Sequence, residues 1–219
     1  MYRSRFSSYY VNMLRVDIEH WDSLCRRMGA NKNINFTYQT LWKNYRASSL
    51  RIYHTFEHVT KCLEVFDSLR HLALKSDECE MAIWFHDSVY NSQSQQNEEM
   101  SAAFADECLY SMGIISDRVR SKVETFILST KYSSAPSNME EQIISDSDLA
   151  IFGQSSEVYD VYEEAVRDEY SWVSDELFWK KRKEILTRFL DRESIYYTDP
   201  CRWMYEQSAR NNIQRSLSR

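Results

Sequence analysis

The sequence predicts an all-α protein, and three observations carry this prediction. Glycine and proline are scarce, with 3 and 2 copies among 219 residues, whereas sandwiches, barrels and doubly wound folds need both for tight turns. Apolar residues recur at steps of three and four, which is the spacing of one helix face. No stretch alternates with period two for long enough to require a sheet. We therefore expect a single-domain helical bundle over residues 1–219, with a core at about 9–192 and a C-terminal helix at about 202–216.

The expected helices follow one another without an internal repeat or a domain-splitting linker. The first carries an apolar stripe from Val11 to Met28 and ends at Gly29, a residue type that often terminates helices. Asn97 is expected to cap a helix that starts with two glutamates and ends near Gly113, because negative charge favours a helix N-terminus. Further helical patterns cover residues 36–47, 54–72, 155–171 and 175–191, and one more carries the stripe from Val119 to Ile127.

The composition excludes several classes of function. The chain has 27 basic and 33 acidic residues and a formal net charge of -6, whereas a general nucleic-acid binder is usually basic. The five cysteines are widely spaced and form no CxxC pair, so reduced thiols in the cytoplasm are expected. No apolar run reaches signal-peptide or membrane-spanning length. We therefore expect a cytoplasmic protein with no membrane or generic nucleic-acid partner, and the oligomeric state stays open.

Two groups of histidines suggest a metal site. His54 and His58 are four residues apart, which places them on one face of a helix. His86 and Asp87 directly follow a compact apolar run, and a carboxylate buried there without a partner costs several kcal/mol. A divalent cation would supply that partner. The alternatives are a hydrogen-bonded core or surface histidine pair and a solvent-exposed aspartate at a helix end.

Two aspartates form a third feature. Asp146 and Asp148 have strongly apolar neighbours in the segment IISDSDLAIF. Capping of a helix or an Asx turn explains Asp146 well, because a helix could start there, but it explains both residues together less well.

The order His…His-Asp…Asp resembles the HD superfamily of metal-dependent phosphohydrolases, helical proteins that hold a divalent cation with two histidines and two aspartates. The similarity is closest to a small subgroup described as predicted metal-dependent HD phosphohydrolases, and the YHTFEH segment also resembles the start of the cyclic-nucleotide phosphodiesterase motif. The resemblance spans roughly residues 9–216. It is carried by residues 51–59, 82–90, 97–102, 146–153, 165–173 and 208–213.

This resemblance implies a set of metal ligands. His58, His86 and Asp87 would be three of them, and the fourth would be Asp148, with Asp146 as the alternative. Asp148 is preferred because the sequence Asp-Leu-Ala resembles the Asp-Leu-Ser that holds metal in the phosphodiesterases. The cofactor expected is one divalent cation, namely Mn, Fe, Co, Ni, Zn or Mg.

The resemblance also implies roles for four further residues. His54 matches the histidine that acts as general acid. Glu98 and Glu99 match an acidic pair that hydrogen-bonds a metal-bound water or His54, although a charged first helical turn explains them equally well. Arg51 is a candidate phosphate contact or a surface residue.

The function expected from these residues is hydrolysis of a phosphoester, with a small phosphorylated molecule such as a nucleotide as substrate. No histidine follows residue 86, and Tyr132 stands near the place where the subgroup would have one, so a mononuclear site is expected. The alternative functions are a non-catalytic metal- or nucleotide-binding module and a plain helical interaction protein. HExxH zincin and P-loop chemistry are excluded because neither motif occurs.

Overall fold

A computed structural model of the chain describes residues 18–218, and every regular element within that range is helical. This confirms the predicted all-α class. The expected first helix is present over residues 18–27, and its earlier part lies outside the described residues. Among the described helices, none combines the length and apolar character needed to cross a bilayer. The α-helices are α2 (Ile34–Asn44), α3 (Phe56–Leu69), α4 (Ser76–Phe85), α5 (Asn97–Ser111), α6 (Asp117–Ser129), α7 (Met139–Leu149), α8 (Ser156–Glu169), α9 (Asp175–Leu190) and α10 (Asp199–Leu217), with short 3-10 segments η1 (Arg70–Leu72) and η2 (Ala150–Gly153).

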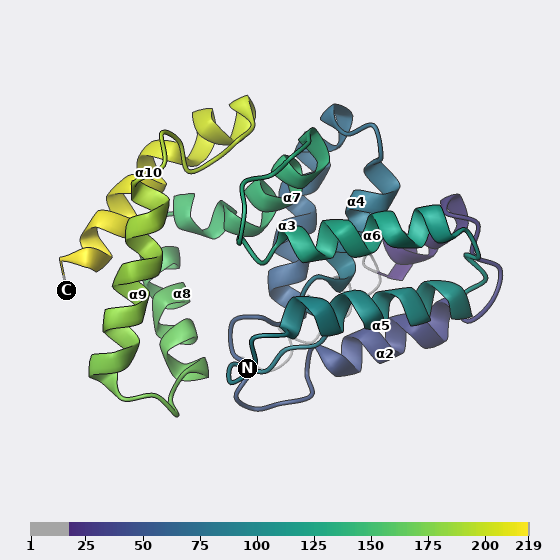
Figure 1. Cartoon of the computed structure of the whole chain (residues 1–219), viewed down its shortest axis with the longest axis horizontal. Helices are drawn as coiled ribbons and strands as arrows, with labels where there is room; N and C mark the ends of the chain where they lie inside the picture. Colours follow the sequence, from purple (N-terminus) through teal and green to yellow (C-terminus); the bar gives the residue numbers. More distant parts are fainter. Residues whose placement is uncertain (1–17, 219) are drawn as a thin grey trace, which may run out of the picture.

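The helices form two groups that meet at α7 and η2 (Figure 1). At one end α8, α9 and α10 lie together, and at the other α2, α5 and α6 lie with the helical residues 18–27. Helix α3 packs against α4 and α7, and α10 packs against η2 and α9. A cluster of aromatic side chains fills the core between these helices; the fully buried Trp21 and Trp84 rings, for example, lie 5.4 Å apart. Helices α3, α4 and α7, which carry or directly precede the predicted ligands, therefore lie in the middle of the helical bundle.

Several predicted helix ends are close to the observed ones. Gly29 and Gly113 follow helical segments with φ of 91° and 92°, a conformation that glycine adopts without steric cost. Helix α10 begins at Asp199, three residues earlier than expected. Pro200 lies in its first turn, where the missing backbone N–H removes no helical hydrogen bond.

The predicted capping role of Asn97 is wrong. Asn97 is the first residue of α5, and Gln96 occupies the N-cap position without a side-chain cap bond. The Asn97 side chain instead accepts a hydrogen bond from the backbone N–H of Asn91 and donates one to the carbonyl of Asn91. It therefore closes the 91–96 loop on itself, which satisfies two backbone groups of the loop rather than the free N–H groups of the helix.

Gly153, at the end of η2, allows α10 to approach closely. A Cβ placed on Gly153 would lie 2.4 Å from the Cβ and 2.9 Å from the Cα of Tyr205. No real Cβ comes so close to another atom, so only glycine fits between η2 and the backbone of α10. Through this contact α10 packs directly against η2, the segment that follows Asp148 in the chain.

Candidate metal centre

The four preferred ligands come from three helices that pack on one another. His58 lies in the first turn of α3, His86 and Asp87 lie in the turn that follows α4, and Asp148 lies in the last turn of α7. Adjacent residues on a helix diverge by about 100°. Because His86 and Asp87 occupy a turn rather than the helix itself, both can face the same point.

The separations of the donor atoms match those of ligands around one cation. The Nε2 atoms of His58 and His86 are 3.2 Å apart. Oδ1 of Asp148 lies 3.0 Å from His58 Nε2, and Oδ2 of Asp87 lies 3.2 Å from His86 Nε2. The two longer carboxylate-to-imidazole separations are both 3.7 Å. Ligands about 2.1 Å from a shared cation are about 3.0 Å apart at right angles and about 3.4 Å apart in a tetrahedron. The donor set therefore fits one divalent cation.

The charges at this site favour a bound positive ion. The side chains of His58 and His86 are 3% exposed, and those of Asp87 and Asp148 are 15% and 19% exposed. Burial opposes ionisation of both aspartates, yet the histidines hold the pKa of Asp87 and of Asp148 below the usual value. Burial also opposes charge on His86, but the two carboxylates raise its pKa to about 9. The charges of these two largely buried carboxylates are thus balanced either by a protonated imidazole or by a metal cation.

Two hydrogen bonds orient the ligands. Nδ1 of His86 lies 2.8 Å from the carbonyl oxygen of Ile83, so it donates there and leaves Nε2 as the ligand nitrogen. The hydroxyl of Tyr132 donates to Oδ2 of Asp148, which leaves Oδ1 facing the histidines. Tyr132 has a φ of 52°, a left-handed conformation that is rare for a bulky residue. Sequence patterns gave no sign of this contact.

The structure brings Asp148, and not Asp146, to the histidines. Asp146 is fully buried, and its carboxylate accepts hydrogen bonds from the backbone N–H groups of Tyr197 and Thr198 at 2.8 and 2.7 Å. The Thr198 hydroxyl adds a third bond at 2.7 Å. Asp146 therefore anchors the segment that precedes α10.

His54 lies beside the ligands in a bend before α3, rather than on the same helix as His58 as predicted. Helix α3 begins at Phe56, but the rings of His54 and His58 are still only 5.9 Å apart. The His54 side chain is 24% exposed, and the ring of Tyr90 stacks on it with a centroid distance of 4.2 Å. It is therefore accessible to a ligand at the metal centre.

Glu169, a residue that the sequence reasoning missed, holds His54 in place. Its Oε2 lies 2.6 Å from His54 Nδ1 and accepts a hydrogen bond from the Tyr90 hydroxyl. Its Oε1 accepts from the backbone N–H groups of Ile52, Tyr53 and His54. Burial opposes a charge on His54, but the carboxylates of Asp87 and Glu169 raise its pKa. The only sequence signal was that Glu169 falls in the resembling segment 165–173.

Arg51 binds the backbone around the site. Its guanidinium donates to the carbonyl oxygens of His54 and Asp87, and to that of Asn44 at 3.3 Å. The side chain is largely buried, and its guanidinium lies 4.5 Å from the centre of the Tyr45 ring. In this arrangement Arg51 joins the two chain segments that carry His54 and Asp87.

The two predicted acidic residues differ in their surroundings. Glu99 is exposed and forms an ion pair with Lys131, which also donates to the carbonyl of Gln95. Glu98 is half-buried; burial raises its pKa, and the charge of Asp87 adds to the effect. Of the two glutamates, Glu98 is therefore the one whose pKa is affected by the charge of Asp87.

Cys62 of α3 lies next to His58. Its sulfur is 3.7 Å from Nδ1 and 3.6 Å from Nε2 of His58, so the thiol packs against the imidazole ring. Burial raises the pKa of this thiol well above its usual value. Together with His58, His86 and Asp148 it offers a donor set whose atoms all lie within 4.8 Å of one another.

Comparison with known proteins did not place the chain in a family. No family model, curated protein or solved structure matches it. The function therefore has to be argued from the site itself.

Proposed function

We propose that this protein is a metal-dependent phosphohydrolase of the HD type, which hydrolyses a phosphoester of a small molecule such as a nucleotide. The observation that supports this proposal is the convergence of four ligand side chains on one point, with a fifth, titratable side chain beside them. Two imidazoles and two carboxylates neutralise a divalent cation and leave positions open for other oxygen ligands.

The metal ligands would be His58, His86, Asp87 and Asp148. When bound, a divalent cation supplies a Lewis acid that polarises a phosphoryl group and lowers the pKa of an attacking water. Imidazole nitrogens suit Zn, Fe, Co and Ni, and the carboxylates also suit Mn and Mg. Tyr132 and Ile83 would keep the ligand atoms directed at the cation through the hydrogen bonds described above.

His54 would be the proton donor to the leaving group. In the reaction the attacking water would release a proton to solvent as its oxygen bonds to phosphorus, the ester P–O bond would break, and the departing oxygen would take a proton from His54. Glu169 stabilises the protonated imidazole through the 2.6 Å contact and fixes the orientation of the ring. Tyr90 covers one face of the ring, which limits its motion.

The proposal is tested by measuring metal content and turnover together. Wild type and Asp87→Ala are purified without a metal-affinity column, and Glu124→Ala on the exposed face of α6 serves as the matched control. We expect about one transition metal per chain in wild type and control, loss of the metal in Asp87→Ala, and hydrolysis of some phosphoesters only by the first two proteins.

Two outcomes would contradict the proposal in different ways. Absence of metal, even after incubation with Mn²⁺, Ni²⁺ or Fe²⁺, would overturn the metal centre itself. Metal that depends on Asp87 but is accompanied by no turnover on a broad panel of phosphoesters would instead favour a binding module without hydrolytic activity.

A further inference from the structure

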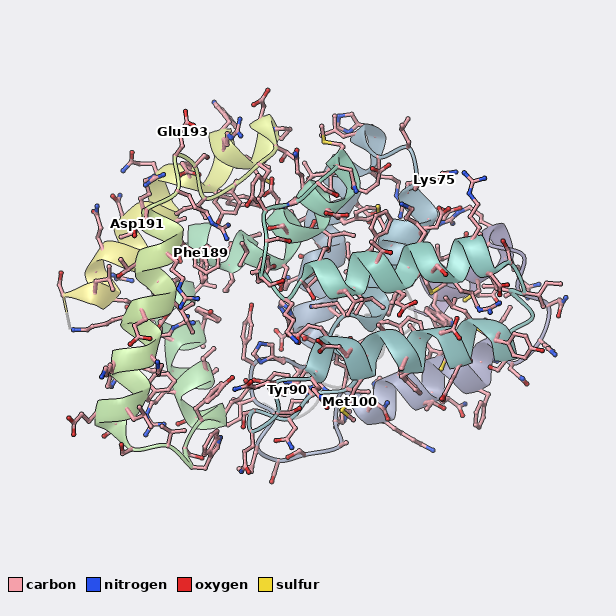
Figure 2. All side chains as sticks on the ribbon, in the orientation of Figure 1. Lys75, Tyr90, Met100, Phe189, Asp191 and Glu193 are labelled. Carbon is pink, nitrogen blue, oxygen red and sulfur yellow. The ribbon has the colours of Figure 1, made fainter. Side chains whose placement is uncertain are left out.

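A cavity that contains none of the candidate metal ligands lies beside Tyr132. It has a volume of about 750 Å³ and opens between the connection from α6 to α7 and the connection from α9 to α10. Figure 2 labels Phe189, Asp191 and Glu193 at the end of α9 that borders this region. We call it the 132/192 cleft after two of its lining residues, Tyr132 and Arg192.

The guanidinium of Arg192 is the main charged group of the cleft. It packs over the ring of Phe189 with a distance of 4.5 Å to the ring centre, and Nη1 is enclosed without a hydrogen-bond partner. Among the residues that the structure describes, Arg192 forms no ion pair, and its side chain has no hydrogen bond. The Nε and Nη2 donors therefore have no hydrogen-bond acceptor among the described residues.

The second cation, Arg202, is partly neutralised. Its Nε donates to the carbonyl of Tyr196 at 2.9 Å, and its Nη1 lies 3.2 Å from Asp199. The exposed Glu193 also lines the cleft. The unpaired positive charge at the cleft is accordingly that of Arg192, with Arg202 at the opposite end of the same connection.

The connection that carries Arg192 is fixed by buried and half-buried charged groups. Glu206 of α10 accepts the backbone N–H groups of Ile195 and Tyr196, and Arg210 donates to the carbonyl oxygens of Arg192 and Glu193.

Asp146 holds the next two residues of this connection, as described above. The loop is therefore already shaped before any ligand binds, which lowers the entropic cost of binding.

Tyr132 connects the cleft to the metal centre. Its ring lines the cleft and lies 6.1 Å from the ring of Phe189, and its hydroxyl binds the ligand Asp148. The side chains of Arg192, Phe189 and Tyr132 thus lie in series between the cleft and Asp148.

We propose that the 132/192 cleft binds a phosphate group through Arg192. The planar guanidinium forms paired hydrogen bonds to phosphate oxygens, and the serine hydroxyls beside Tyr132 add neutral donors. Phosphate binding in the cleft does not depend on the proposed function.

Phosphate binding is tested with inorganic phosphate on protein kept metal-free with a chelator, so that no bound metal ion takes part. Calorimetry is performed on wild type, Arg192→Gln and the matched control Arg188→Gln, which removes an exposed cation from the last turn of α9. We expect Arg192→Gln to weaken phosphate binding about tenfold or more and Arg188→Gln to change it less than about twofold. Thermal unfolding of each variant shows that it is folded.

Equal phosphate binding by wild type and Arg192→Gln would overturn the cleft even if the protein hydrolyses phosphoesters. Phosphate binding that depends on Arg192 in a protein without turnover would support the cleft and count against the proposed function.

Discussion

At the scale of single residues, His54 depends on a partner 115 positions later in the chain, Glu169. The same carboxylate accepts three backbone N–H groups of the bend that carries His54, so it determines both the path of the backbone and the direction of the ring. Burial opposes its ionisation, but the hydrogen bond from His54 keeps the pKa of Glu169 below its usual value. Glu169 is therefore a positioning residue that acts through His54.

The change Glu169→Gln tests this role. An amide can still accept the backbone hydrogen bonds, but it cannot balance the charge of a protonated imidazole. We expect turnover to fall about 10- to 100-fold, while the metal content stays at the wild-type level because Glu169 contacts none of the four ligands. Glu164→Gln, on the exposed face of α8, is the control. Unchanged turnover in Glu169→Gln would show that His54 does not donate the proton.

The sequence indicated the candidate ligands better than the groups around them. The resemblance to the HD superfamily implied His58, His86 and Asp87, and the last two also directly follow a compact apolar run. Glu169 and Tyr132 were not recognised, because each reaches the site from a distant segment through tertiary packing. The choice between Asp146 and Asp148 also needed the structure, since both have similar neighbours along the chain.

At the scale of helices and loops, periodicity located most helices to within a few residues but not the details of their ends. Helix α9 was expected at 175–191 and occupies Asp175–Leu190. His54 was predicted to lie on a helix because its four-residue spacing to His58 suits one, whereas hydrogen bonds from the backbone N–H groups of residues 52–54 to Glu169 hold this segment in a bend. Asn97 was predicted to cap α5, whereas the oxygen and the nitrogen of its side-chain amide both bind the backbone of Asn91 in the preceding loop. The local sequence pattern does not show which other groups of the protein form hydrogen bonds with these segments.

Gly153→Ala tests the close contact between η2 and α10. The added methyl group would clash with backbone and Cβ atoms of Tyr205, which cannot move without shifting α10. We expect a loss of stability of about 1–3 kcal/mol, which is typical of overpacked positions, measured as the free energy of unfolding in urea. Gly29→Ala is the comparison, because its Cβ would meet no atom within 4 Å and only the positive φ is unfavourable. Wild-type stability of Gly153→Ala would mean that α10 does not lie so close.

At the scale of the whole molecule, Glu80 joins three segments that are far apart in the sequence. Its fully buried carboxylate lies 2.8 Å from His20 and 2.9 Å from Arg27 in the first described helix, and it also pairs with Arg70 after α3. Burial opposes its ionisation, but the hydrogen bonds from His20 and Arg70 lower the pKa of Glu80. The hydrogen bond to Glu80 raises the pKa of His20. Folding is thereby linked to pH at a point away from the metal centre.

The free energy of unfolding should therefore decrease at low pH, where the contribution of Glu80 is lost, and at high pH, where that of His20 is lost. The contribution of Glu80 is present above its unfolded pKa of about 4.3 and is lost as the pH falls through its lowered folded-state pKa. The contribution of His20 is complete below its unfolded pKa of about 6.5 and is lost as the pH rises through its raised folded-state pKa.

The change His20→Gln should therefore destabilise the protein more at pH 5.5 than at pH 9. We expect the midpoint of thermal unfolding to fall by about 2–4 °C at pH 5.5, which corresponds to about 1 kcal/mol for a chain of this size. His71→Gln removes an exposed imidazole and is the control. An equal decrease at both pH values in His20→Gln would show that the pair with Glu80 is not charged in the folded protein.

The placement of Asp146 and Asp148 on α7 has a consequence for how the protein can change over time. The two residues are two positions apart, so they point to different sides of one helix, one to the metal ligands and the other to the loop before α10. A substitution that tilts α7 would disturb both sides at once and would be difficult to tolerate. Variation is therefore expected at residues 191–194 of that loop rather than at Tyr197 and Thr198, which donate hydrogen bonds to Asp146.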